Sequence, residues 1–282
     1  MDYLAILNKH IRDANINFDA GPHKYTIAAA GASAGAASAG AGASAGAASA
    51  DDAYTSVTTW VHSHFWEFDA DLIIANMMKG KGWSKSKYFG QTPAEIKAGW
   101  DLNRDTAATA GTLLHSQIEA YYNKVATVGG DETDTRSIEY NYFLNFIKAF
   151  PELKPYRTEW TIYDEEVRIA GSVDMVYEKP DGTLMIYDWK RAKEIVKTTA
   201  FMKFAKTDCI SYIPDTNFWH YALQLNTYKT IIERKYGKTV VKLVLVCLHP
   251  IKKNYELMVL PILTTEMAQL FALRLAEITT KT

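Results

Sequence analysis

Two aspartates and a lysine fall on strand-like runs in the middle of the chain. Asp174 closes Gly171-Ser172-Val173-Asp174, and Asp188 opens the triplet Asp188-Trp189-Lys190. The turn Lys179-Pro180-Asp181-Gly182 lies between the two runs, so we expect their strands to be neighbours and both carboxylates to converge. Close carboxylates raise each other's pKa unless a cation lies between them, and Mg²⁺ prefers such oxygen ligands. The pattern predicts one or two Mg²⁺ (or Mn²⁺) ions.

Lys190 extends this prediction to catalysis. In a strand, residues two apart share a face, so the Lys190 ammonium would reach the pocket of Asp188. There it could orient or deprotonate a water and neutralise charge on a phosphate under attack. A single Asp-x-Lys triplet is more often a surface ion pair, and the functional interpretation depends on the other motifs of the chain.

Two helical pairs supply those motifs. His115 and Glu119, within Gly111-Thr112-Leu113-Leu114-His115-Ser116-Gln117-Ile118-Glu119, share one helix face, as do Gln224 and Tyr228 further along. Taken alone, the first pair is typical of a helix surface. For the second pair, the simple expectation is core packing for Tyr228 and solvent for Gln224.

The elements that must position these residues follow from hydrophobic periodicity and turn residues. We predict an N-terminal helix over 2–13, a hairpin over 15–27 around Gly21-Pro22, and helical pieces at 58–80, from Thr92-Pro93 to Lys124, and at 141–150. Strands at 157–163, 167–177 and 184–189 precede a helix at 215–236, strands at 240–248 and 255–260, and a helix at 264–279. This order indicates an α/β fold, with a central mixed sheet flanked by helices.

One segment, residues 28–50, contains only Ala, Gly and Ser and repeats a nonapeptide from Gly31 at Gly42. Such a composition buries too little surface to offset its ordering entropy, and a perfect repeat is typical of an engineered or stand-in linker. We therefore divide the chain into an N-terminal helix and hairpin (1–27), this linker (28–50) and one catalytic domain (51–282).

Composition restricts the classes of function. The formal net charge of the 282 residues is −1, so a phosphate-binding surface would have to be local. The two cysteines cannot ligate a four-cysteine iron–sulfur cluster. The start of the chain, with an acid at position 2, is not typical of a signal peptide, and no long apolar run predicts a membrane span. We expect an intracellular protein, in the cytoplasm or a DNA-containing compartment, that is not secreted.

Taken together, the motifs resemble the PD-(D/E)XK nuclease superfamily, in the RecB-like branch that includes mitochondrial, phage and viral exonucleases. The similarity lies in the order Gly-x-x-x-His-x-x-x-Glu, Gly-x-x-Asp, Asp-x-Lys and Gln-x-x-x-Tyr, preceded by Ser56-Val57-Thr58. It spans roughly residues 54–248. The resemblance implies a restriction-endonuclease-like core of order αβββαβ, here with extra N-terminal elements.

The resemblance also implies residue roles. Metal ligands would be His115, Asp174, Asp188 and the backbone carbonyl of Trp189. Lys190 would be the catalytic lysine, Gln224 and Tyr228 would meet the scissile phosphate, and Glu119 would be a carboxylate behind the first ligands or on a second metal, with Glu159 a further candidate. Ser56 and Thr58 would contact DNA phosphate. To these we add Arg191 and Lys193 as DNA contacts, because their charge lies beside the pocket, although solvated surface is the commoner place for such residues.

The function implied is metal-dependent hydrolysis of DNA phosphodiester bonds, by an exonuclease acting on DNA ends in replication, recombination or repair. DNA with single-stranded ends is the expected partner, without a membrane or iron–sulfur cluster. Trp60, Phe65 and Trp66 could stack on unpaired bases, although core packing is the simpler role for the first two. A structure-specific endonuclease with the same site, and a nucleic-acid-binding module with an inactive site, remain alternatives.

Overall fold

The computed structural model describes residues 3–19, 21, 24–28, 54–124, 137–199 and 202–280. The linker predicted at 28–50 lies outside these residues except for Ala28, so its character stays a prediction. The helices are α1 (Tyr3–Leu7), α2 (Val57–His62), α3 (Ala70–Lys79), α4 (Pro93–Tyr122), α5 (Ile138–Ala149), α6 (Asn217–Lys235) and α7 (Thr264–Thr279). The strands are β1 (Ile16–Asp19), β2 (Lys24–Ile27), β3 (Thr55–Ser56), β4 (Lys154–Asp164), β5 (Ile169–Glu178), β6 (Leu184–Lys190), β7 (Val240–Cys247) and β8 (Glu256–Val259).

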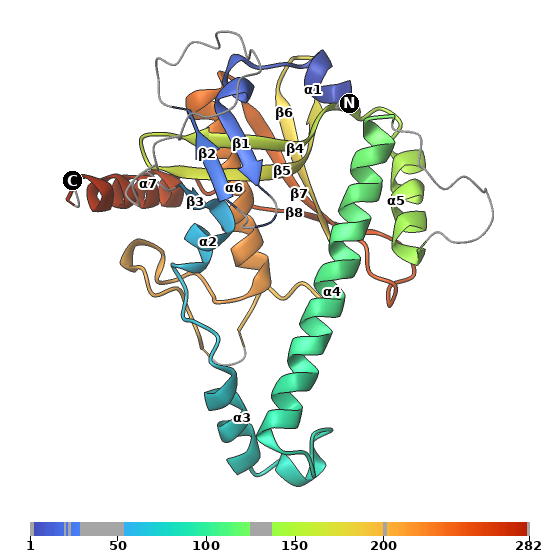
Figure 1. Ribbon diagram of the computed structural model, residues 1–282, viewed down its shortest axis with the longest axis vertical. Coiled ribbons are helices and arrows are strands. Elements are labelled where there is room, and N and C mark those ends of the chain that lie inside the picture. Colours follow the sequence, from blue (N-terminus) through green and yellow to red (C-terminus); the bar gives the residue numbers. More distant parts are fainter. Residues whose placement is uncertain are drawn as a thin grey trace, which may run out of the picture.

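A mixed sheet forms the centre of the molecule (Figure 1). β4, β5 and β6 run antiparallel in turn, β7 joins β6 in parallel, and β8 returns antiparallel to β7, while the short β3 pairs with the start of β5. The tight turn between β5 and β6 places Gly182 at a φ of 78°, a conformation that glycine adopts without strain. The predicted mixed α/β sheet is confirmed.

Helices cover both faces of this sheet. In β6, Leu184 and Ile186 pack into the hydrophobic cluster that contains α6, whereas Tyr187 and Trp189 pack into the one that contains α4 and α5. This alternation, the normal period of a strand, sends Asp188 and Lys190 toward the α6 side. The helices therefore form two layers around the strand that carries the candidate triplet.

The N-terminal segment differs from its prediction. Helix α1 ends at Leu7, and a separate 3-10 turn, η1 (Ile11–Asn15), follows. The reason is local. The Asn8 side chain donates to the Tyr156 carbonyl at 2.7 Å, and His10 begins the next turn by accepting from Arg12 N at 3.2 Å. The predicted hairpin forms as β1 and β2 and packs against the sheet through a small cluster that includes Tyr25 and Tyr163.

The predicted helical region 58–80 is two helices. Asp69 caps α3 by accepting from Leu72 N at 2.9 Å, so the second helix begins anew after the break at Ser63. Between Thr92 and Lys124, by contrast, where the sequence suggested pieces, there is one uninterrupted helix of 30 residues. Its start is the predicted one: Thr92 and Glu95 cap each other's backbone N–H groups, and Pro93 occupies the first turn.

Helix α4 has two halves with different surroundings. Toward its C-terminal end, Leu114, Ile118 and Tyr122 are buried against the body, whereas Ile96 is the buried residue of its first turns. The first half projects away from the sheet with α3 packed beside it (Figure 1). We call residues 66–104 the arm. Across the described ranges, no helix combines the length and apolarity needed to cross a membrane.

Candidate functional site

Three carboxylates lie in one row across three adjacent strands. The β4–β5 register pairs Thr158 with Met175 and Trp160 with Val173, which sets Glu159 opposite Asp174. The β5–β6 register, which pairs Met175 with Tyr187, sets Asp174 opposite Asp188 one position further. Residues directly opposite each other in an antiparallel pair have neighbouring side chains. The convergence predicted for Asp174 and Asp188 thus follows from the hairpin, with Glu159 added from the third strand.

His115 reaches this row from α4. Its Nδ1 lies 3.5 Å from Glu159 Oε1 and 3.6 Å from Asp174 Oδ2. Its other ring nitrogen, Nε2, lies 2.8 Å from the Trp189 carbonyl, which accepts its hydrogen bond. One donor atom from each of His115, Glu159 and Asp174 falls within 4.8 Å of the others, so this group could hold a divalent cation. A hydrogen bond at Nε2 fixes the tautomer that presents Nδ1 as a ligand.

Asp188 and Lys190 form a buried ion pair beside this group. Lys190 Nζ lies 2.8 Å from Asp188 Oδ2, and the Asp188 side chain is 1% exposed. Asp188 Oδ1 is buried without a hydrogen-bond partner among the described residues. Asp174, by contrast, has one oxygen held by the Trp189 backbone N–H at 3.0 Å. A buried carboxylate oxygen without a donor is costly, and a cation is one way to satisfy it.

The charges of the site perturb one another. Burial lowers the pKa of His115, but the carboxylates of Asp174 and Glu159 outweigh it and raise that pKa to about 9. Burial and the nearby Asp174 carboxylate raise the pKa of Asp188. Burial lowers the pKa of Lys190, yet Asp188 and Asp174 raise it more, so Lys190 stays an ammonium. Buried titratable groups that perturb one another in this way are common at functional sites.

Tyr228 and Gly171 explain part of the Gly-x-x-Asp pattern. The hydroxyl of Tyr228 accepts from Gln224 Nε2 at 3.1 Å, within the same face of α6. A Cβ added at Gly171 would lie 2.7 Å from Tyr228 Cε1 and 2.9 Å from Val57 Cγ2. Only glycine therefore lets α2 and α6 approach β5 this closely. At Gly111, in contrast, an added Cβ meets nothing within 4 Å.

The other residues predicted for the site lie outside the group formed by His115, Glu159 and Asp174. Ser56 caps α2 by accepting from Thr59 N at 3.1 Å, and Thr58 is exposed in its first turn. Glu119 lies one helical turn beyond His115, half-buried and outside the three-residue group. The Arg191 guanidinium pairs with Glu139 of α5 at 2.7 Å, so much of its charge is already neutralised. Lys193 is exposed after the end of β6.

Glu159 belongs to the site more closely than the sequence indicated. Its φ of 44° is in the left-handed region, which is strained for a side chain of this type. The strained backbone accompanies a hydrogen bond from the Ser172 hydroxyl to Glu159 Oε2 at 3.0 Å. Such strain is common at functional sites. The signal available in the sequence was its position in the strand that precedes the strand of Asp174.

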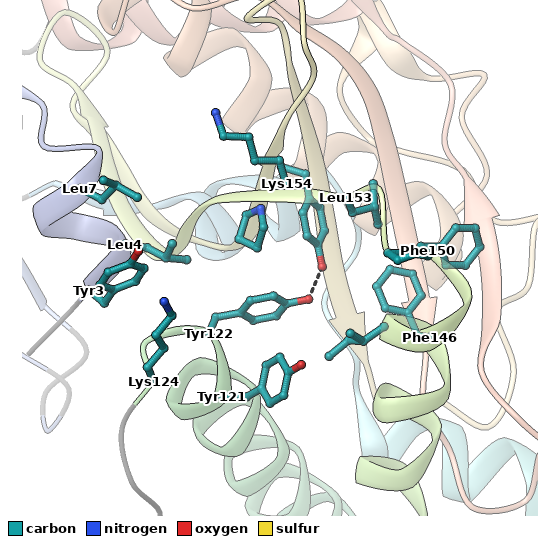
Figure 2. Close-up of a pocket in the computed structure, with 14 residues that line it drawn as sticks. Tyr3, Leu4, Leu7, Tyr121, Tyr122, Lys124, Phe146, Phe150, Leu153 and Lys154 are labelled. Atoms are coloured by element: carbon teal, nitrogen blue, oxygen red, sulfur yellow. Dashed lines mark hydrogen bonds between the residues drawn. The ribbon is translucent and has the colours of Figure 1, made fainter.

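Of the three aromatic residues considered for stacking, Trp60 and Phe65 are core residues at 3% and 2% exposure, whereas Trp66 is 64% exposed. A separate groove of about 530 Å³ lies where α1 meets the C-terminal ends of α4 and α5 (Figure 2). Its lining is mainly aromatic and aliphatic, and its polar centre is a hydrogen bond between the hydroxyls of Tyr122 and Tyr177. None of the predicted site residues lines this groove.

Comparisons with known proteins add little to this geometry. No model of a protein family matches the chain, and no curated protein matches it either. Among solved structures, SSO0001 is similar over 80% of this chain and 74% of its own, with 14% identical residues and a TM-score of 0.31. This likeness carries no information about the chemistry of the site.

Proposed function

We propose that this protein is a metal-dependent nuclease that hydrolyses DNA phosphodiester bonds from strand ends, built on a restriction-endonuclease-like core. The observation that carries the proposal is the meeting of His115, Glu159 and Asp174 within 4.8 Å, beside the buried Asp188–Lys190 pair. A cation site flanked by one lysine, at the junction of a sheet with two helices, suits hydrolysis of an anionic ester.

The donor set fits a hard divalent cation. Asp174 and Glu159 offer carboxylate oxygens, the ligands that Mg²⁺ and Mn²⁺ prefer, and the imidazole nitrogen of His115 is compatible with such a site. Asp188, expected from the sequence as a ligand, lies outside this three-residue group and pairs with Lys190. The Oδ1 of Asp188 is buried without a hydrogen-bond partner among the described residues, so a cation beside it would satisfy this oxygen. The Trp189 carbonyl, which holds His115 in place, is a further candidate ligand. When bound, the cation would lower the pKa of a water and polarise the phosphate.

Side chains around the cation would position the water and the phosphate. Lys190, held as an ammonium by Asp188, orients the attacking water and balances the charge that develops on the phosphate oxygens. Gln224 and Tyr228 offer an amide and a hydroxyl on the neighbouring face of α6, where they position the phosphate. Asp174 and Glu159 keep the imidazole of His115 aligned through charge. No part of this scheme needs an iron–sulfur cluster.

The test compares two substrates under one set of conditions. Purified protein is incubated with Mg²⁺ and either end-labelled linear single-stranded DNA or a circular single strand. We expect release of short products from the linear DNA, intact circles, and no reaction in EDTA. Lys190→Ala should lower the rate by at least about 100-fold, since positioned charge of this kind contributes that much or more. Lys148→Ala, which changes an exposed lysine of α5, is the matched control.

Each outcome has a consequence. If wild type leaves both substrates intact, the nuclease proposal fails and a binding role replaces it. If circles are cut as fast as linear strands, the requirement for an end is wrong and the protein is an endonuclease. If Lys190→Ala cuts as fast as wild type, the site is wrongly placed. Calorimetric titration with Mn²⁺ checks the donor set separately, because Asp174→Asn should weaken metal binding.

A further inference from the structure

The tip of the arm, residues 79–92, carries charge that the catalytic centre does not use. It contains Lys79, Lys81, Lys85 and Lys87, and no acidic residue occurs in the sequence between Asp71 and Glu95. All four lysines are exposed, and no described carboxylate forms an ion pair with any of them. In a chain whose net charge is −1, this is a local positive surface of four charges.

Aromatic side chains accompany these lysines. At the tip, Trp83 and Phe89 lie edge to face with ring centroids 5.9 Å apart, and Phe89 is 58% exposed. A single exposed apolar side chain is ordinary on a protein surface, but several gathered on one surface mark a site of interaction. Glycine and serine separate the lysines and the aromatic residues, so the backbone of the tip presents few bulky obstacles to a ligand.

The aromatic surface continues from the tip toward the body. Trp100 donates to the Tyr88 hydroxyl at 2.8 Å, and its ring lies 6.0 Å from that of Phe68. Phe68 is 72% exposed and helps to line a shallow cleft of about 250 Å³ between α3 and α4. Trp66, also exposed, marks the end of the arm nearest α2. The charged residues that line this cleft are already paired, Lys97 with Asp71 and Arg104 with Asp101.

We infer that the arm binds single-stranded nucleic acid, with the tip lysines on its phosphates and the exposed rings under its bases. This inference rests on the proposed function and adds a second contact to the same substrate. Lysines and exposed aromatic faces together match an unpaired strand, whose bases are free to stack, whereas a duplex would hide them. A protein partner would have to supply acidic and apolar groups at matching positions, whereas an unpaired strand carries phosphates and stackable bases along its whole length.

The helix fixes how far this contact lies from the catalytic centre. From Pro93 to His115 is 22 residues of continuous α4, or about 33 Å along the axis at about 1.5 Å per residue. A strand with a rise of about 3.4 Å per nucleotide covers that distance in about ten nucleotides. An unpaired strand extends further per nucleotide than this duplex rise, so about ten nucleotides is an upper bound, and a strand of about 25 nucleotides reaches both the tip and the centre.

The test measures binding without metal, so that no cleavage interferes. Fluorescence anisotropy gives the affinity for labelled oligodeoxythymidine of about 8 and about 25 nucleotides, at several salt concentrations. For the longer strand, K79S/K81S/K85S/K87S should lose at least about tenfold in affinity, and its salt slope should fall by up to about 2.8, or 0.7 for each of four phosphate contacts. Phe89→Ala should lose about five- to hundredfold, the range for one stacked base.

The matched control changes four exposed lysines elsewhere, as K9S/K148S/K242S/K253S, and should bind as wild type does. The inference is overturned if the tip variant keeps wild-type affinity and slope, if the control loses as much, or if the variant changes only self-association. It is also overturned if blunt duplex depends equally on Phe89. Failure of the proposed function would give a different result, because the wild-type protein would then cleave no strand in Mg²⁺. The affinities measured without metal do not depend on cleavage and test the arm separately.

Discussion

Substitution of Gly171 by alanine tests whether stability depends on the close approach of α2 and α6 to β5 at this position. The new Cβ would lie 2.7 Å from Tyr228 Cε1 and 2.9 Å from Val57 Cγ2, both on side chains that are at most 3% exposed. Neither contact is made by the tip of a long, flexible side chain that could move aside. The added methyl group would therefore have to displace α2, α6 or β5. Overpacking of this kind costs about 1–3 kcal/mol of unfolding free energy, and we expect Gly171→Ala to lose an amount in that range.

Urea unfolding followed by circular dichroism measures this loss. Gly111→Ala is the matched control, because its added Cβ meets nothing within 4 Å and the position is inside α4. That variant should gain about 0.5–1 kcal/mol, the usual benefit of alanine over glycine in a helix. Tyr228→Leu removes the ring carbon that clashes, so the Gly171→Ala penalty should shrink in that background. A Gly171→Ala protein within about 0.5 kcal/mol of wild type would refute the steric argument.

Two further predictions concern stability alone. Burial lowers the pKa of His64 to about 4 from 6.5, so between these values the unfolded chain binds a proton that the folded one does not. Unfolding free energy should therefore fall by about 2 kcal/mol from pH 7.5 to pH 5 on account of His64, and a His64→Gln variant that shows the same fall would exclude this cause. Arg157 pairs with Asp13 at 2.7 Å through a side chain that is 6% exposed. Arg157→Met should lower the free energy of unfolding, measured in urea, by about 3 kcal/mol, because it leaves the Asp13 carboxylate without its partner. Adding Asp13→Asn to that variant should restore part of the lost free energy. If the losses of the two substitutions simply add, the two residues are not coupled.

The strands and their turn were predictable because their signals are local. Alternation of apolar residues sets which face of β6 a side chain takes, and the turn at Gly182 sets the register with β5. The neighbouring positions of Asp174 and Asp188, and the shared face of Asp188 and Lys190, follow from these two features. The start of α4 was equally local, since Thr92 and Glu95 form a capping box.

The boundaries of α1 and of the helices in 58–80 were predicted less well. α1 stops at Leu7 because Asn8 bonds to the carbonyl of Tyr156, which is 148 positions away. Hydrophobic periodicity carries no information about such a contact. The continuity of α4 was missed for a related reason, because its projecting half lacks the buried stripe from which helices are normally identified.

The amino-acid sequence by itself determined the order of the longer strands along the chain, the hairpin and the identity of the residues that could do chemistry. The tertiary structure alone decided how they meet: the pairing of β4 with β5 brings the Glu159 carboxylate into the row, and the packing of α4 places His115 against the Trp189 carbonyl at 2.8 Å. Periodicity and turns act between residues close in the chain. The approach of α4 to β6 depends instead on how two hydrophobic layers pack, which short-range patterns do not encode.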